Sequence, residues 1–180
     1  GLASADSAQA RAQLALAELK RTKAFDRDVL VLATATGTGW LDPDVMDAGE
    51  CLHGGDTAIV SQQYSYLPSW ISFLVDQENA REAGRALYDT VIEAWAAEPE
   101  ATRPKLIVYG LSLGSFGGQA AFSGVNDMRR SVDGVLFVGS PNDSETWRQI
   151  TNRRDAGTPE WQPTYAGGPA VRFASTKEDI

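Results

Sequence analysis

The sequence predicts an α/β fold with a mostly parallel sheet and helices on both faces, and three observations support this prediction. Short apolar runs alternate along the chain with stretches whose apolar residues have helical spacing. The first of these runs shows no alternation of polar and apolar residues, which favours a strand buried on both faces. The stretches between the runs are long enough for helical crossovers between parallel strands. The predicted strands are residues 28–36, 57–64, 105–109 and 133–138.

The first half of the chain supplies two predicted helices and two predicted strands. Residues 7–24 carry apolar side chains at helical spacing behind polar residues that suit an N-cap, and they predict an amphipathic helix. The strand over residues 28–36 ends at the glycine-rich segment 37–39. A short helix over residues 43–52 then leads to the strand 57–64, which is rich in β-branched and aromatic residues.

The second half continues the same pattern. Residues 78–97 place apolar residues four apart and predict a long helix that leads to the strand 105–109. A helix that reaches about residue 124 separates this strand from the strand 133–138, and a short helix is predicted at residues 145–153. Together these elements form a β-α-β-α-β-α-β series, which is typical of a parallel sheet.

Residues 1–180 are expected to form a single domain whose last elements are missing. A chain of this length normally folds as about one domain with its own core. After residue 139 the composition shifts to Pro, Asn, Asp, Thr and Gly, with one short apolar run at residues 170–174. Because buried parallel strands need neighbours, we expect a further strand and helix beyond residue 180.

Composition excludes several classes of function. The chain has 24 acidic and 16 basic residues, a net charge of −8, and no basic run interleaved with aromatic residues. We therefore expect no nucleic-acid partner. The longest apolar window, residues 67–75, is far shorter than the roughly 20 residues that a membrane-spanning helix needs. Nothing in these residues is expected to cross a bilayer.

We expect neither a metal nor a cofactor. Cys51 and His53 would lack two of the partners that a zinc site needs. The segment Gly37-Thr-Gly39 follows a strand, as a dinucleotide-binding fingerprint does, but Asp42 stands where the third glycine would be. The chain contains no P-loop pattern.

The most informative motif is Gly110-Leu-Ser-Leu-Gly114, which lies between a predicted strand and a helix start rich in small residues. In this context G-x-S-x-G indicates a nucleophile elbow, a sharp turn that exposes the serine hydroxyl above the sheet. We therefore predict Ser112 as the catalytic nucleophile, and a structural turn that contains a serine is the alternative. The backbone N–H of Leu113, at the start of the helix, is predicted to donate to the oxyanion.

The partners of the serine are less clearly marked in the sequence. Gly37 and Thr38, in the loop after the first strand, are predicted to supply the second oxyanion donor, although a simple glycine-rich turn would look the same. Asp143 follows the strand 133–138, from which a carboxylate can reach a histidine near the elbow, so it is a candidate acid. A turn or a helix cap is the alternative role for Asp143.

A catalytic histidine is the missing component. His53 is the single histidine, and it precedes a strand, which places it at the edge of the sheet opposite the elbow. Open α/β sheets do not form their active sites at that edge. We therefore expect a loop or capping role for His53, and we expect the acid and the histidine of the site beyond residue 180.

Five segments of the chain together carry a resemblance to a known family: residues 24–27, 33–40, 53–60, 63–75 and 110–115. They resemble the actinobacterial α/β-hydrolase membrane proteins, in which a multi-pass N-terminal region precedes a hydrolase-like catalytic domain. The resemblance covers nearly all 180 residues. It implies an α/β-hydrolase-like fold, Ser112 as nucleophile, a membrane-spanning part before residue 1, and an acid and a histidine after residue 180.

The leading interpretation is therefore a serine hydrolase, esterase-like or lipase-like, or an acyltransferase. It would act on an ester or thioester through an acyl-enzyme at Ser112. The membrane association of the resembled family suggests lipid or cell-envelope substrates and a soluble domain of a membrane-anchored protein. We expect the 180 residues alone to be inactive. The alternative is a catalytically inactive, hydrolase-like module for binding or for assembly of a membrane protein.

Overall fold

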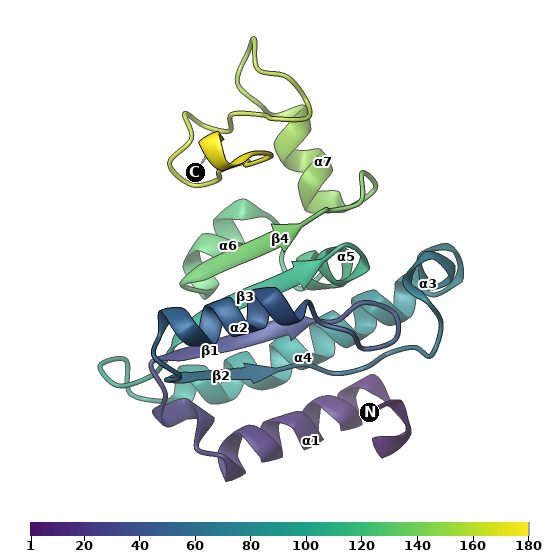
Figure 1. Ribbon diagram of the computed structural model, residues 1–180, viewed down its shortest axis with the longest axis vertical. Helices are drawn as coiled ribbons and strands as arrows, with labels where there is room; N and C mark the ends of the chain where they lie inside the picture. The colour runs from purple at the N-terminus through teal and green to yellow at the C-terminus, as the bar shows by residue number, and fades with distance from the viewer. Residues whose placement is uncertain (180) are drawn as a thin grey trace.

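The computed structural model describes residues 1–179, apart from the side chains of residues 69, 70 and 73, and it shows a parallel sheet flanked by helices (Figure 1). The strands of this part of the chain follow the order β2-β1-β3-β4, and every neighbouring pair is parallel. Their carboxyl ends therefore share one edge of the sheet. The predicted α/β fold class is confirmed. The strands are β1 (Val29–Thr34), β2 (Thr57–Val60), β3 (Lys105–Leu111) and β4 (Gly134–Val138).

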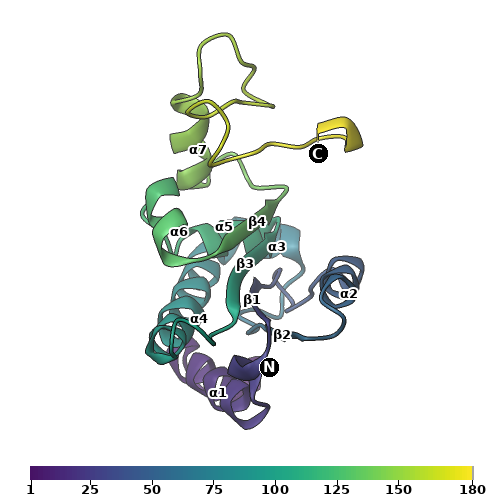
Figure 2. The same ribbon diagram turned by 90° about the vertical axis from the view of Figure 1, so that its left-hand side faces the viewer.

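Helices lie on both faces of the sheet, as predicted. Helices α1, α4, α5 and α6 lie on one face and α2 lies on the other (Figure 2). None of the helices described over residues 1–179 is both long enough and apolar enough to cross a bilayer. The helices are α1 (Ala8–Arg21), α2 (Pro43–Leu52), α3 (Ser69–Val75), α4 (Gln77–Ala97), α5 (Leu113–Gln119), α6 (Val125–Ser131) and α7 (Glu145–Asn152).

Three elements differ from the sequence prediction. Strand β2 ends at Val60, and two residues later the Gln62 side chain donates to the carbonyl of Ala83 on α4, so the chain has left the sheet. Residues 69–75 form α3, which is too short to produce a clear periodic pattern. The helix predicted to reach about residue 124 ends at Gln119 as α5, and a separate helix, α6, follows Gly124, whose φ is 146°.

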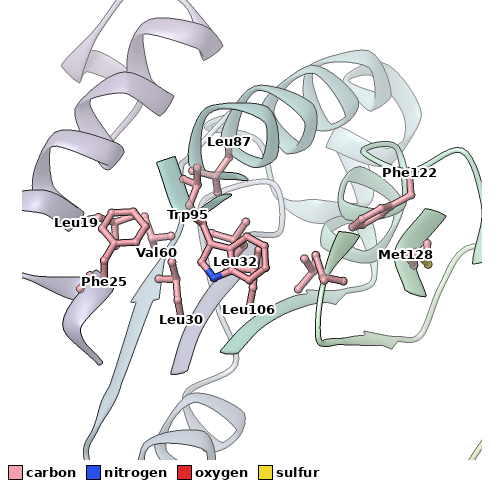
Figure 3. Packing of buried hydrophobic residues seen from close by; sticks show 14 residues of the cluster. Leu19, Phe25, Leu30, Leu32, Val60, Leu87, Trp95, Leu106, Phe122 and Met128 are labelled. Carbon is pink, nitrogen blue, oxygen red and sulfur yellow. The ribbon is translucent and has the colours of Figure 1, made fainter. Parts of the chain in front are cut away.

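The core lies between the sheet and α1, α4 and α6 (Figure 3). Leu30 on β1, Leu106 on β3 and Leu87 on α4 are almost completely buried, and each contributes about 1.5–3 kcal/mol relative to an exposed side chain. At the amino edge of the sheet the Trp95 indole N–H donates to the Pro104 carbonyl at 2.7 Å. This core fixes the sheet, and the sheet places the segment that follows β3.

One carboxylate secures the start of α6 and gives the fold a predictable acid sensitivity. The Asp127 carboxylate accepts from the N–H and the hydroxyl of Ser123, at 2.9 and 3.0 Å, and from the Ser131 hydroxyl at 3.1 Å. The backbone N–H of Ser123 is the main reason that the pKa of Asp127 is lowered. A lowered pKa in the folded state contributes stability above the unfolded value of about 3.9, and that stability is lost as the pH falls through the folded value.

Asp127→Asn is therefore expected to lower the free energy of unfolding at pH 7 by about 1 kcal/mol. Thermal unfolding at several pH values measures this, and the difference from wild type should begin to shrink below about pH 4, where the carboxylate of the unfolded chain takes up a proton, and should vanish once the folded carboxylate is also protonated. Asp89→Asn, at an exposed position of α4, is the matched control and should change little. A difference at Asp127 that stays constant down to pH 3 would contradict this explanation.

Candidate active site

Ser112 lies in the turn that joins β3 to α5, and its backbone conformation is unusual. Its φ is 53° and its ψ is −118°, in a region that residues with a side chain rarely occupy. Such a conformation costs on the order of 1–3 kcal/mol and persists only when the surrounding structure enforces it. The strand-turn-helix context expected for the motif is present.

The two glycines of the motif are required by close backbone packing. A Cβ at Gly114 would run into the carbonyl oxygen of Thr34 at the end of β1. A Cβ at Gly110 would lie 2.6 Å from the Gly114 carbonyl oxygen and 2.7 Å from the backbone nitrogen of Ser115. The elbow is therefore pressed against the end of β1, and a side chain at either glycine would displace it.

The Ser112 side chain faces outward from the carboxyl edge of the sheet. Ser112 is exposed, whereas all residues of α5 from Leu113 to Gln119 are buried. Its backbone N–H donates to the carbonyl of Val138 at 2.8 Å, which ties the turn to the end of β4. Its hydroxyl makes no hydrogen bond to any residue in the described range. Ser112 is thus exposed at the carboxyl edge, and its hydroxyl is not hydrogen-bonded to a described residue.

Leu113 is the first residue of α5, so its N–H has no acceptor within the helix. Its side chain is buried in a small cluster with Tyr64 and Phe116, and this packing anchors the start of α5. Burial, together with the Asp76 carboxylate, raises the pKa of Tyr64, so the phenol beside the elbow stays neutral at physiological pH. Leu113 is therefore anchored through its side chain at the start of α5, directly after Ser112.

Gly37 and Thr38 lie in the loop that follows β1, at the same edge as the elbow. Two hydrogen bonds close this loop, from the Gly39 N–H to the Thr36 carbonyl and from the Thr36 N–H to the Trp40 carbonyl. These bonds do not use the N–H groups of Gly37 and Thr38. Gly37 is buried, and Thr38 is exposed.

A close contact also explains the glycine at position 37. A Cβ there would lie 2.6 Å from the Ser72 hydroxyl oxygen on α3, so the loop passes directly against that helix. Ser72 is itself fully buried and donates to the Leu67 carbonyl at 3.1 Å. Packing therefore requires a small residue at Gly37, whatever its chemical role.

His53 is not brought near Ser112. It is exposed at the carboxyl end of α2, four residues before β2 begins at Thr57. Thr57 pairs with Val29, the first residue of β1, so His53 belongs to the amino edge of the sheet. No group of three or more His, Cys, Asp or Glu side chains that could hold a metal gathers within the described part of the chain.

Asp143 lies in the loop between β4 and α7, at the carboxyl edge. It is exposed, and its carboxylate accepts from the Gln77 amide at the start of α4, at 3.3 Å. This bond joins the loop after β4 to the first residue of the long helix α4. Asp143 thus shares an edge with Ser112, and its carboxylate is paired with an amide rather than with an imidazole.

Sequence reasoning missed a buried hydrogen-bonded cluster beneath the elbow, formed by Ser115 and Gln119 on α5 and Ser140 in the loop after β4. Ser115 is completely buried and Gln119 is 5% exposed. The spacing of Ser115 and Gln119 is the one sequence signal for this cluster, because residues four apart lie on the same face of a helix. We call this group the Gln119 cluster.

A cleft of about 720 Å³ opens along the outer side of β4. Its walls come from β4, α6, α7 and residues 170–175, and they are largely apolar. The run 170–174 does not form a strand but lies across this cleft, where Phe173 packs edge-on against Trp147 with ring centroids 5.3 Å apart. Leu136 on β4 remains 50% exposed.

Comparison with known proteins agrees with this geometry. The family model described as the alpha/beta-hydrolase family matches residues 1–180. Searches of curated proteins and of solved structures gave no match. The matched family supports a hydrolase-type function. The parallel sheet, the elbow turn and the match over residues 1–180 lead to one conclusion: the chain belongs to the alpha/beta-hydrolase family.

Proposed function

We propose that this domain is a serine-dependent hydrolase or acyltransferase that acts on an ester or thioester through an acyl-enzyme at Ser112. The observation that carries the proposal is the exposed hydroxyl of Ser112 on a backbone with φ 53° and ψ −118°, between a buried strand and a buried helix. Such strain is retained where the surroundings enforce it, and it is common at functional sites.

The proposed reaction has two steps. The Ser112 oxygen attacks the acyl carbon while a base takes its proton, and the carbonyl electron pair moves onto the oxygen. The Leu113 N–H, with Gly37 or Thr38, donates to that oxyanion. The intermediate then expels the alcohol or thiol, which receives the proton, and leaves the acyl group on Ser112. Water releases the acid in hydrolysis, and an alcohol releases a new ester in acyl transfer.

We propose Asp143 as the candidate acid, with an acid outside residues 1–180 as the alternative, and we propose that the histidine comes from polypeptide outside residues 1–180. The open edge of β4 supports this. The Ser112 N–H donates to the Val138 carbonyl, and this bond fixes which residues of β4 face β3. In the observed register, the backbone N–H and C=O groups of Val135 and Phe137 therefore point away from β3. These groups can pair with a further strand, which would deliver side chains to the carboxyl edge beside Ser112.

The substrate and cellular setting are proposed from the family resemblance. We propose a lipid or cell-envelope ester as substrate and a membrane anchor outside these residues, in an actinobacterial protein. The apolar cleft beside β4 is compatible with an apolar substrate but does not select one. We propose no metal and no cofactor, because the reaction needs only a serine, a base and oxyanion donors.

Covalent acylation of Ser112 tests the proposed function. When the full-length protein is mixed with a p-nitrophenyl ester, we expect a burst of p-nitrophenol before steady turnover, because the acyl-enzyme accumulates. Mass spectrometry of the acid-quenched protein should find the acyl group on the peptide that contains Ser112. Adding an alcohol should raise turnover if the enzyme is an acyltransferase. An acyl group found on other residues alone, without a burst, would refute the proposal.

A catalytically inactive binding or assembly module is the second candidate, and two observations favour it. His53 lies at the far edge from Ser112, and β4 presents an unpaired edge beside an apolar cleft. An exposed strand edge of this kind can accept an extended segment of another protein. Absence of Ser112 acylation in the full-length protein, together with retained folding, would favour this module over the enzyme.

A further inference from the structure

The Gln119 cluster joins the elbow helix to the loop after β4. The Gln119 amide nitrogen donates to the hydroxyls of Ser115 and Ser140, each at 2.9 Å, and the two hydroxyls lie 2.5 Å apart. The Gln119 oxygen accepts from the backbone N–H of Trp147 at 3.2 Å. Because a backbone N–H can only donate, this last bond sets the orientation of the amide.

Gln119 also caps the start of α7, a role that the N-cap residue of a helix usually has. Trp147 is the third residue of α7, and its N–H has no acceptor within the helix. The N-cap residue Ser144 would normally supply the acceptor, but its hydroxyl is buried without a partner. Gln119 supplies it instead, from α5. The start of α7 is therefore held by the same helix that begins at the elbow.

We propose that Gln119 and Ser140 are positioning residues of the active site. They clamp the loop over residues 139–144 onto α5, so that Asp143 stays at a set distance from Ser112. The inference rests on the proposed function, since the position of Asp143 matters to the reaction only if Ser112 is the nucleophile. Both ends of the clamp are buried or half-buried, so water competes poorly for the hydrogen bonds.

The test replaces Gln119 in the full-length protein and measures both the loop and the serine. Gln119→Met keeps the side-chain volume and removes all three hydrogen bonds, whereas Gln119→Glu can still accept from the Trp147 N–H and from one of the two hydroxyls while the other hydroxyl donates to its neighbour. Trp95→Phe removes one buried hydrogen bond at the opposite edge of the sheet and controls for general destabilisation. Hydrogen–deuterium exchange follows residues 139–147, and a fluorophosphonate probe follows Ser112 as a function of pH.

We expect Gln119→Met to speed exchange in residues 139–147 by about 10-fold or more and to slow Ser112 labelling at least about 10-fold. The pH profile of labelling should also shift, because the carboxylate is displaced from the base. Gln119→Glu should recover most of both losses, and Trp95→Phe should leave loop exchange, labelling and pH profile unchanged. The pH profile separates positioning from a merely structural role.

Two results would overturn the inference. If the wild type is labelled and Gln119→Met behaves like Trp95→Phe, the clamp has no role, while the proposed function stands. If the wild type is not labelled at Ser112, the proposed function fails. In that case unchanged exchange over residues 139–147 in Gln119→Met refutes the clamp as well, whereas faster exchange confined to this segment supports it as a structural device of the loop.

Discussion

Replacing Ser112 by alanine is expected to abolish fluorophosphonate labelling of the full-length protein and to lower ester or thioester turnover by about 10⁶-fold. The hydroxyl is the only atom group removed, and it is the group that would form the covalent bond. Since Ser112 is exposed and its hydroxyl makes no hydrogen bond to other described residues, the substitution should leave the fold intact. Thermal unfolding of the variant provides that check.

Two matched variants show whether the loss is specific. Ser4→Ala removes an exposed hydroxyl near the amino terminus and should label like the wild type. His53→Ala should also label like the wild type, because His53 belongs to the amino edge of the sheet. Equal labelling of Ser112→Ala and wild type would remove the nucleophile assignment, and loss of labelling in His53→Ala would show that this imidazole serves the serine.

Residues 1–180 by themselves supply a further contrast for the same experiment. Residues 1–180 alone should label at Ser112 weakly or not at all, because a serine hydroxyl without a base is a poor nucleophile. Strong labelling of these residues would instead place the base among them.

Gly114→Ala is expected to destabilise the domain by about 3 kcal/mol, the second large effect. The new methyl group would collide with the carbonyl oxygen of Thr34, which belongs to the backbone of β1 and cannot rotate away. Either the elbow is displaced from the sheet or strand β1 is distorted, and both changes weaken the packing between them. Urea or thermal unfolding measures the loss, and Ser112 labelling should fall with it.

Gly49→Ala is the matched control for this prediction. Gly49 lies inside α2, and a Cβ built there meets no atom within 4 Å. The same substitution should therefore stabilise the protein by about 0.5–1 kcal/mol, because alanine is the better helix former and restricts the unfolded chain. If Gly114→Ala were as stable as Gly49→Ala, the close approach of the elbow to β1 would be wrong.

Much of the architecture could be predicted from local patterns. Helices α1, α2, α4 and α7 and all the strands of the described sheet follow periodicity, capping residues and apolar runs, which are properties of neighbouring residues. The helix predicted after the elbow was wrong in its extent, since α5 ends at Gln119 and α6 begins only after Gly124. The run 170–174 has a strand-like composition but lies across a cleft, because composition does not specify a pairing partner.

The sequence by itself determined the elbow motif and, through the position of His53 before β2, its separation from Ser112, because chain order in a parallel sheet decides which edge a residue occupies. Only the tertiary structure decided how the turn is enforced, with Gly114 against Thr34, and how the loop after β4 is held by Gln119. These contacts join residues far apart in the chain. No local pattern encodes them, since each depends on how separate elements pack.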